Sequence, residues 1–153
     1  MTAPAAAVTA ADARVRTALR RATIARIATV TPSGGPLIMP LYFVVLDGRI
    51  YMNNAATSPT VRNIAAHPHV LVLLQCRDGE VVRVRGTARY LQDAATMRRV
   101  TRASIPKYVL RPRALWFWIR NRSRLSARAQ YTRERPDTGM IEVTPDAYAV
   151  TPA

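Results

Sequence analysis

The residues with the clearest capacity for chemistry form a six-residue segment, Ser-Pro-Thr-Val-Arg-Asn, that begins at Ser58. Ser58 is a favoured residue type for capping a helix N-terminus, and Pro59 suits the first helical position, where its missing N–H is not needed. Because Val61 stands where a capping box requires Glu or Gln, we expect the first-turn amides to be free for an external anion. Arg62 adds a positive charge, and residues 49–77 contain no Asp or Glu between them. This segment therefore predicts a phosphate-binding helix N-terminus.

Other reactive sets are missing from the sequence. It contains no Gly-x-Ser-x-Gly motif, no Walker loop, no Gly-x-Gly-x-x-Gly fingerprint and no Cys-x-x-Cys pair. The acidic residues are scattered singly, so no acid–base pair and no catalytic side chain is assigned. His67, followed by Pro68, is expected to end a helix rather than to bind a metal, and Cys76 is expected to be an inert strand thiol. An enzyme of this kind generally takes its chemistry from a cofactor.

The positive charge is concentrated in one block. Residues 98–135 contain twelve basic residues and one acid, Glu134, in a chain whose net charge is +14. Such a block favours an anionic partner, which could be a membrane surface, a nucleic acid or a ligand with an acidic tail. A solvated Arg-rich face is an equally good interpretation. Of the macromolecular partners we favour the anionic membrane surface, and nucleic acid less.

The length and composition predict one globular domain. The chain has 153 residues, 49% of them hydrophobic, which is enough for a substantial core. We expect residues 1–9 to form a disordered tail and residues 10–153 to form a single domain. No signal peptide and no apolar run of about 18 residues is found. The single cysteine suits a reducing compartment, so the sequence predicts a cytoplasmic protein.

The hydrophobic periodicity gives the elements that must position these residues. Asp47-Gly48 and Asp78-Gly79 are typical hairpin turns, Pro106 is expected to break a helix, and Pro145 is expected to interrupt the last strand. The expected helices cover residues 10–22, 59–66, 93–102 and 114–131, and the expected strands cover residues 24–31, 37–46, 49–53, 70–76, 81–91, 140–143 and 147–151. This order predicts an α+β, mainly antiparallel β protein: a closed or partly closed barrel of about six strands with peripheral helices.

Three runs of the sequence resemble a known family. They are Ile27–Val45, which contains Pro-Leu-Ile-Met-Pro-Leu-Tyr, then Asp47–Met52, and Ser58–Val70. Together they are similar to the pyridoxamine 5′-phosphate oxidase-like (FMN-binding) split β-barrels, which include flavin- and deazaflavin-dependent oxidoreductases. The resemblance covers about residues 12–91 well, residues 103–139 only loosely, and returns in the last strand.

The resemblance implies a homodimer with two cofactor sites at the subunit interface. The cofactor would be coenzyme F-420 or FMN, and the acidic tail of F-420 would suit the Arg-rich block at 98–135. Many relatives carry Lys or Arg where this chain has Pro59 or Thr60, so the phosphate end lacks a cation that they have. The ring would lie along Met39, Pro40, Leu41 and Tyr42, the ring or ribityl chain would contact Asn53 and Asn54, and the phosphate would contact Ser58, Thr60, Arg62 and Asn63.

Two classes of function follow. The first is an oxidoreductase that transfers hydride to or from a small organic substrate. The alternative is a non-enzymatic split barrel that has lost this cofactor and uses residues 98–135 on an anionic surface or nucleic acid. Haem binding, which some split barrels show, is a further form of the alternative, with His67 or His69 as the candidate ligand.

Overall fold

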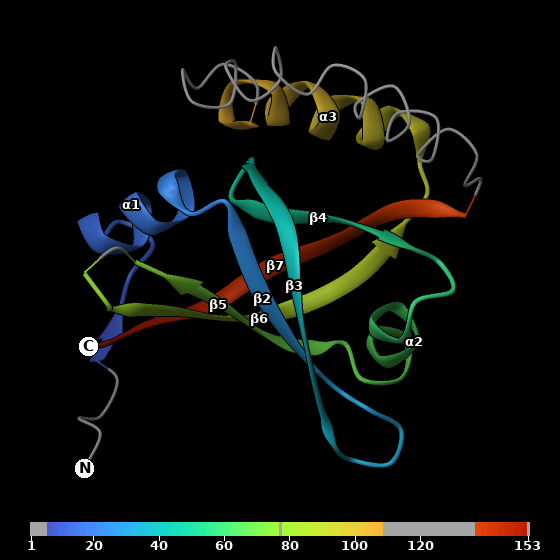
Figure 1. The fold of residues 1–153 in the computed structure, drawn as a ribbon, viewed down its shortest axis with the longest axis horizontal. Coiled ribbons are helices and arrows are strands. Elements are labelled where there is room, and N and C mark those ends of the chain that lie inside the picture. The colour runs from blue at the N-terminus through green and yellow to red at the C-terminus, as the bar shows by residue number, and fades with distance from the viewer. Residues whose placement is uncertain (1–5, 77, 109–136, 153) are drawn as a thin grey trace, which may run out of the picture.

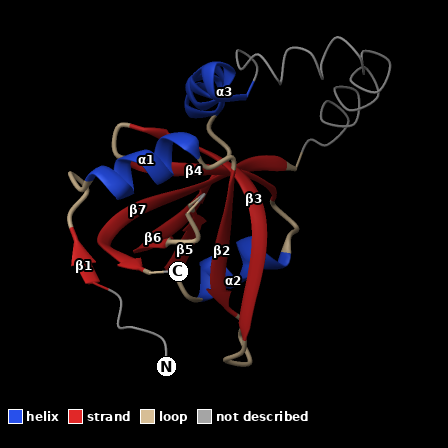
Figure 2. Ribbon diagram, turned by 60° about the vertical axis from the view of Figure 1, so that its left-hand side comes forward, coloured by secondary structure: helices blue, strands red, loops and turns tan. Residues whose placement is uncertain are grey.

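The described part of the chain folds around a β-barrel. The structure is a computed structural model, and it describes residues 6–76, 78–108 and 137–152. The described residues form seven strands and three helices. Figure 1 shows their arrangement, and Figure 2 also labels β1. Their bounds are β1 Ala6–Val8, α1 Ala13–Arg21, β2 Ile24–Val30, β3 Pro36–Leu46, β4 Arg49–Ala55, α2 Pro59–Ala66, β5 His69–Gln75, β6 Val81–Leu91, α3 Ala94–Tyr108 and β7 Thr138–Thr151.

The sheet closes on itself. The strands are hydrogen-bonded in the order β1-β7-β4-β3-β2-β5-β6, and β6 also pairs with β7. Every pairing is antiparallel. Six strands therefore form a closed antiparallel barrel, and β1 is an extra strand beside β7. The expected fold class, a mainly antiparallel split barrel of about six strands with peripheral helices, is confirmed.

The barrel closes around side chains that alternate along its strands. On β6, Val82, Val84 and Ala88 are buried, whereas Arg83 and Arg85 between them are exposed. The same period buries residues on neighbouring strands, because successive side chains of a strand point to opposite faces. The fully buried interior includes Ile27, Phe43, Ile50, Met52, Val72, Leu74, Ile141 and Val143. This apolar interior is the core that fixes the register of the strands around the site.

Two of the helices cover different parts of the barrel. Helix α2 lies at the lower end of the barrel in Figure 1, and α3 lies across the opposite side, above β4. Val100 of α3 packs with Val44, Tyr51 and Met140 in a second, smaller cluster of buried side chains. None of the helices in the described residues is long and apolar enough to span a membrane.

Two of the expected elements differ from the structure. The expected disordered tail contains β1, whose residues Ala6–Val8 pair with Tyr148–Val150 of β7. Helix α3 does not break at Pro106 but continues to Tyr108. There the Lys107 ammonium lies 3.4 Å from the centroid of the Phe43 ring. This contact between Lys107 and Phe43 helps to offset the main-chain hydrogen bond that Pro106 cannot donate.

The last strand also differs from the expectation. β7 runs unbroken through Pro145, because the register with β6 shifts between Arg85 and Gly86. Arg85 pairs with Ala147 and Gly86 pairs with Pro145, which leaves one extra residue on β7 in a bulge. A Cβ atom on Gly86 would lie 2.4 Å from the Thr144 carbonyl oxygen, so only glycine fits there. The expected helix at residues 114–131 lies outside the described residues.

Candidate functional site

The site begins where β3 separates from β4. These strands pair only from Phe43↔Met52 to Leu46↔Arg49. Residues 53–55 of β4 pair with β7 but no longer with β3, and residues 36–42 of β3 pair with β2 alone. One edge of this half of β3 is therefore unpaired among the described residues, and a proline such as Pro40 is tolerated at such an edge. This is the split that gives the segment Met39–Tyr42 an open side.

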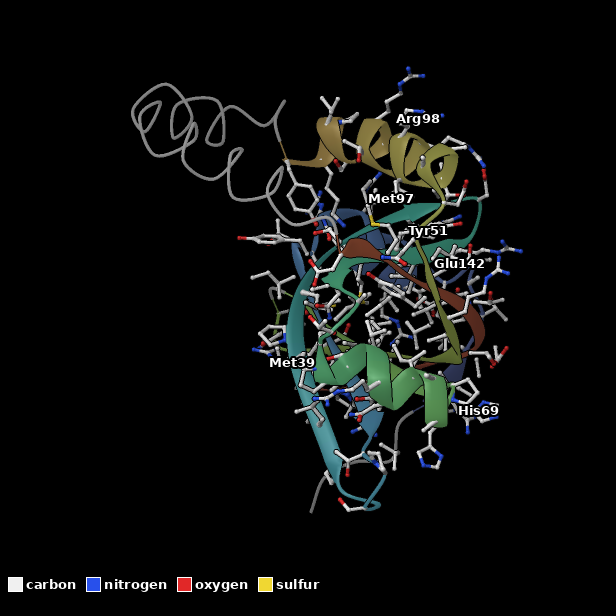
Figure 3. All side chains as sticks on the ribbon, turned by 90° about the vertical axis from the view of Figure 1, so that its right-hand side faces the viewer. Met39, Tyr51, His69, Met97, Arg98 and Glu142 are labelled. Carbon is white, nitrogen blue, oxygen red and sulfur yellow. The ribbon has the colours of Figure 1, made fainter. Side chains whose placement is uncertain are left out.

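The side chains of Met39, Pro40, Leu41 and Tyr42 divide between the two faces of β3. Pro40 and Tyr42 point to the outer face and are exposed, Tyr42 by 54%. Met39 and Leu41 point to the other face, where Leu41 packs against the core and Met39 remains 38% exposed. Figure 3 shows Met39 on β3 at the level of α2. The segment predicted to contact a ring thus combines an open main-chain edge with accessible apolar side chains.

The capping role of Ser58 is confirmed. Ser58 has extended backbone angles, and its Oγ accepts a hydrogen bond of 3.2 Å from the Val61 amide. The expectation that the first-turn amides are free was therefore too broad. Pro59 has no N–H, Val61 donates to Ser58, and the Arg62 amide donates to the Ser58 carbonyl. Among the described residues, only the Thr60 amide of this turn remains without a partner.

The remaining side chains of the predicted phosphate segment divide into buried and exposed. Thr60 and Asn63 are 1% and 3% exposed. The Asn63 amide nitrogen donates to Thr29 Oγ1 at 3.0 Å, which joins α2 to β2. Arg62 is exposed on the other side of the helix. Of the anion-binding groups, solvent therefore reaches the Arg62 guanidinium, whereas the free Thr60 amide belongs to a residue that is 1% exposed. Asn63 holds the helix in place.

Asn53 and Asn54 lie where β4 leaves β3, and their surroundings differ. The Asn53 side chain is exposed and has no hydrogen bond to any described residue. Asn54 Oδ1 accepts a hydrogen bond from the Ala55 amide at 2.9 Å, and its carbonyl accepts one from Tyr90 Oη at 3.1 Å. Asn53 is thus the better placed of the two to contact a ligand.

A cavity of about 300 Å³ lies beside this split. It brings Tyr42 and Asn53, two predicted site residues, together with the inner side of α3. Tyr108 closes one wall. Its ring meets that of Tyr42 edge to face, with centroids 5.6 Å apart, and its hydroxyl accepts from the Phe43 amide at 3.0 Å. The predicted ring segment, Asn53 and α3 therefore form one continuous region.

A family model described as pyridoxamine 5′-phosphate oxidase matches residues 11–151. The chain belongs to the pyridoxamine 5′-phosphate oxidase family. The resemblance seen in the sequence is thereby confirmed, and the match extends through the Arg-rich block. No curated protein matches this family member.

Solved structures are similar to this oxidase-family protein over most of its length. A conserved hypothetical protein from Mycobacterium tuberculosis has a TM-score of 0.71 at 16% identity, over 95% of this chain and 86% of its own. An F420 reductase has a TM-score of 0.60 at 20% identity, over 87% and 94%. An FAD-binding protein from Mesorhizobium loti has a TM-score of 0.62 at 15% identity, over 97% and 96%. At such identities these similarities show the shared fold.

The oxidase-family protein also has a buried carboxylate that the sequence analysis missed. Glu142 of β7 is 3% exposed and accepts hydrogen bonds from Tyr51 Oη at 2.8 Å and Arg89 Nε at 2.6 Å. Arg49 approaches to 3.3 Å. Burial pushes the pKa of Glu142 upward, but the bonds from Arg89 and Tyr51 and the charges of both arginines outweigh it, so the pKa is lowered. Figure 3 shows Tyr51 and Glu142 beneath α3.

These missed residues left weak signals in the sequence. Glu142 is the single charge between two apolar strand residues, Ile141 and Val143, which is unusual for a buried position. Val100 and Ser104 recur at the four-residue spacing of one helix face, so a helix face could be inferred. No local pattern shows that this face packs on β3 and β4, because that contact joins segments about 50 residues apart.

Proposed function

We propose that this family member is an oxidoreductase that binds a flavin-type cofactor, F-420 or FMN, and transfers hydride to or from a small organic substrate. The observation that carries the proposal is the unpaired edge of β3 at Met39–Tyr42, next to the exposed Asn53. An edge with accessible apolar side chains offers a surface for a flat ring. The F420 reductase and the FAD-binding protein that share the fold support a cofactor of this class.

The residues present fit the two ends of such a cofactor unequally. Met39, Leu41 and Tyr42 would contact the ring, and Asn53 would hydrogen-bond its polar edge or the ribityl chain. Arg62 and the positive end of the α2 dipole would hold the phosphate. When bound, the cofactor supplies the hydride chemistry. The protein's own side chains bind it and orient the substrate, and no catalytic side chain is assigned.

We propose a homodimer, because the outer face of β2 and β3 carries exposed apolar side chains around Arg26. Ile24, Val30 and Ile38 are 46%, 40% and 52% exposed. Ile24 pairs with Tyr42, so these side chains adjoin the predicted ring segment. Exposed apolar surfaces of this kind mark interaction sites in folded proteins. A second copy on this face would cover it and complete a site that one chain leaves open along β3.

The acidic tail of F-420 extends from its phosphate, which would lie at α2, whereas the Arg-rich block begins on α3 at the opposite side of the barrel. The described part of the block therefore gives no preference for F-420 over FMN. Within the described residues this block begins on α3, where Arg98 and Arg102 are exposed. Arg99 is paired with Asp47 at 2.7 Å. The remainder of 98–135 lies outside the described residues. A reducing cytoplasm would suit the protein's single free cysteine.

Fluorescence titration of the full-length protein with oxidised F-420 and with FMN tests this proposal. We expect saturable binding of at least one. Arg62→Ala should weaken it about tenfold or more, because a hydrogen bond to a charged group contributes roughly 1.5–3 kcal/mol. The control is Arg16→Ala, which removes an exposed arginine from α1 and should leave the affinity unchanged. No change in fluorescence with either cofactor would refute the proposal.

One observation favours a second candidate, a split-barrel binding protein without this cofactor. The one free amide of the phosphate end belongs to Thr60, which is 1% exposed, and neither Pro59 nor Thr60 supplies the cation that many relatives have. Such a protein would use its Arg-rich block on an anionic surface. Binding to anionic vesicles that falls steeply with salt, without affinity for F-420 or FMN, would support this candidate instead.

A further inference from the structure

The cavity beside α3 is uncharged, in a chain that is strongly basic. Its described walls come from β3, β4, α3 and β7, and none of their lining side chains carries a charge. The chain as a whole has 23 basic and 9 acidic residues. Phe43, Val100 and Met140 in these walls are almost fully buried. A charged ligand group placed here would lose its water without meeting an opposite charge, which is costly.

Aromatic side chains dominate the shape of the cavity. Tyr42, Phe43, Tyr51 and Tyr108 all contribute to its walls. Tyr108 is fixed by its hydrogen bond from the Phe43 amide and by a second one to the Thr23 carbonyl at 2.8 Å. The volume of about 300 Å³ is at the lower end of the range for small-molecule sites. Aromatic walls of this kind suit a flat ring system of two or three fused rings.

The polar groups that remain for a ligand are few and neutral. Tyr51 already donates its hydroxyl hydrogen to Glu142, and Ser104 Oγ donates to the Thr101 carbonyl at 2.6 Å. Among the described residues, the side chains of Asn53 and Thr101 have no hydrogen-bond partner. Both can donate to an oxygen atom. The described lining side chains therefore offer neutral donors for a carbonyl group and no cation for a carboxylate or a phosphate.

We propose that this cavity binds the organic substrate, and that the substrate is a flat, uncharged molecule with a carbonyl group. The inference rests on the proposed function, since Tyr42 and Asn53 belong both to the cavity and to the predicted cofactor contacts. A molecule in the cavity would lie next to the ring. The family is named for a phosphorylated substrate, whereas the described walls of this cavity carry no charged side chain that would hold a phosphate.

A pair of probes of equal shape and different charge tests the inference. Naphthalene-2-carboxamide and naphthalene-2-carboxylate would each be titrated into the full-length protein by calorimetry. We expect the carboxamide to bind and the carboxylate to bind at least tenfold more weakly. The contrast is informative because non-specific attraction to a chain of net charge +14 would favour the carboxylate. Equal or tighter binding of the carboxylate would overturn the inference.

Variants of α3 then locate the binding. Ser104→Leu should fill the cavity and weaken carboxamide binding at least tenfold. Ala95→Leu, which adds the same side chain at an exposed position of α3 outside the cavity, should leave it unchanged. Thr101→Val keeps the shape but removes the hydroxyl, and should weaken carboxamide binding several-fold even if Ser104→Leu fails to fold. Native-like affinity in folded Ser104→Leu, or in Thr101→Val if Ser104→Leu does not fold, would overturn the assignment.

Cofactor affinity separates this inference from the proposed function. F-420 and FMN would be titrated into the same native and variant proteins. If a cofactor binds and the carboxamide does not, the cavity inference fails alone. If the carboxamide binds as expected and neither cofactor does, the proposed redox function fails while the cavity keeps its ligand class.

Discussion

Replacing Glu142 by Gln removes the charge of the buried carboxylate and keeps its size. Native Glu142 is bound by Arg49, Tyr51 and Arg89 from two neighbouring strands. Removing one partner of a buried ion pair typically costs about 3–5 kcal/mol. The side chains of Arg49 and Arg89 are 46% and 63% exposed, so water replaces part of what they lose. We therefore expect a loss of about 2–3 kcal/mol in the free energy of unfolding at pH 7.

The effect of Glu142→Gln should depend on pH in a defined direction. The pKa of Glu142 in the folded protein lies below its ordinary value of 4.5, because the hydrogen bonds and charges of its partners outweigh burial. A lowered pKa stabilises the fold fully above that ordinary value, and this stabilisation is lost as pH falls through the folded-state pKa. The Gln side chain does not titrate. The difference between native protein and variant should therefore narrow below about pH 4.5.

Urea unfolding followed by circular dichroism, from pH 7 down to about pH 3.5, measures this difference. At about 2–4 °C per kcal/mol for a chain of this size, a thermal melt at pH 7 should show a decrease in Tm of about 4–12 °C. The matched control is Glu80→Gln, because Glu80 meets Arg14 only at 3.9 Å near the surface. A difference that is the same at every pH, or no larger than that of Glu80→Gln, would refute the reasoning.

Two further substitutions test the bulge and the proposed interface. Gly86→Ala places a Cβ atom 2.4 Å from a carbonyl oxygen of β7 and should destabilise the fold by about 2 kcal/mol or more. The control Gly35→Ala, whose Cβ atom would have its nearest neighbour at 3.4 Å, should be tolerated. Equal urea midpoints for the two variants would contradict the strain argument. Ile38→Glu puts a charge among the exposed apolar side chains of β3 and should convert a dimer into a monomer with weaker cofactor binding. Light scattering measures the dimer and titration measures the cofactor affinity, and the control Thr17→Glu on α1 should change neither. A dimer unaffected by Ile38→Glu would place the interface elsewhere.

The sequence predicted best those elements whose cause is local. Helix α2 has the expected bounds, 59–66, because Ser58, Pro59 and the His67-Pro68 exit are all local signals. Strand β6 has the expected bounds, 81–91, because its alternation is strict and Gly79 precedes it in a turn. Elements that depend on distant partners were less predictable. The path of β7 through Pro145 requires a bulge in β7 opposite Gly86 of β6, about 60 residues away.

The candidate site shows the same division. The cap at Ser58 was predictable, whereas the burial of Asn63 depends on which face α2 turns toward the barrel. A signal was available: Thr60, Asn63 and Ile64 share one face at the three- and four-residue spacing of a helix, and Ile64 is apolar. That spacing could have placed Asn63 inside and Arg62 outside. The cavity could not be predicted, since it requires the contact of α3 with β3 and β4.

The two ends of the site differ in charge, and this difference would orient what binds there. At one end α2 presents Arg62 and the positive end of its dipole. At the other end α3 and the barrel enclose a cavity without a charged side chain. The unpaired edge of β3 runs between the two. A cofactor with a phosphate and an uncharged ring could therefore bind in one direction only, with its phosphate at α2 and its ring toward Tyr42. In that direction its reactive ring faces the cavity, which is where an uncharged substrate would be held.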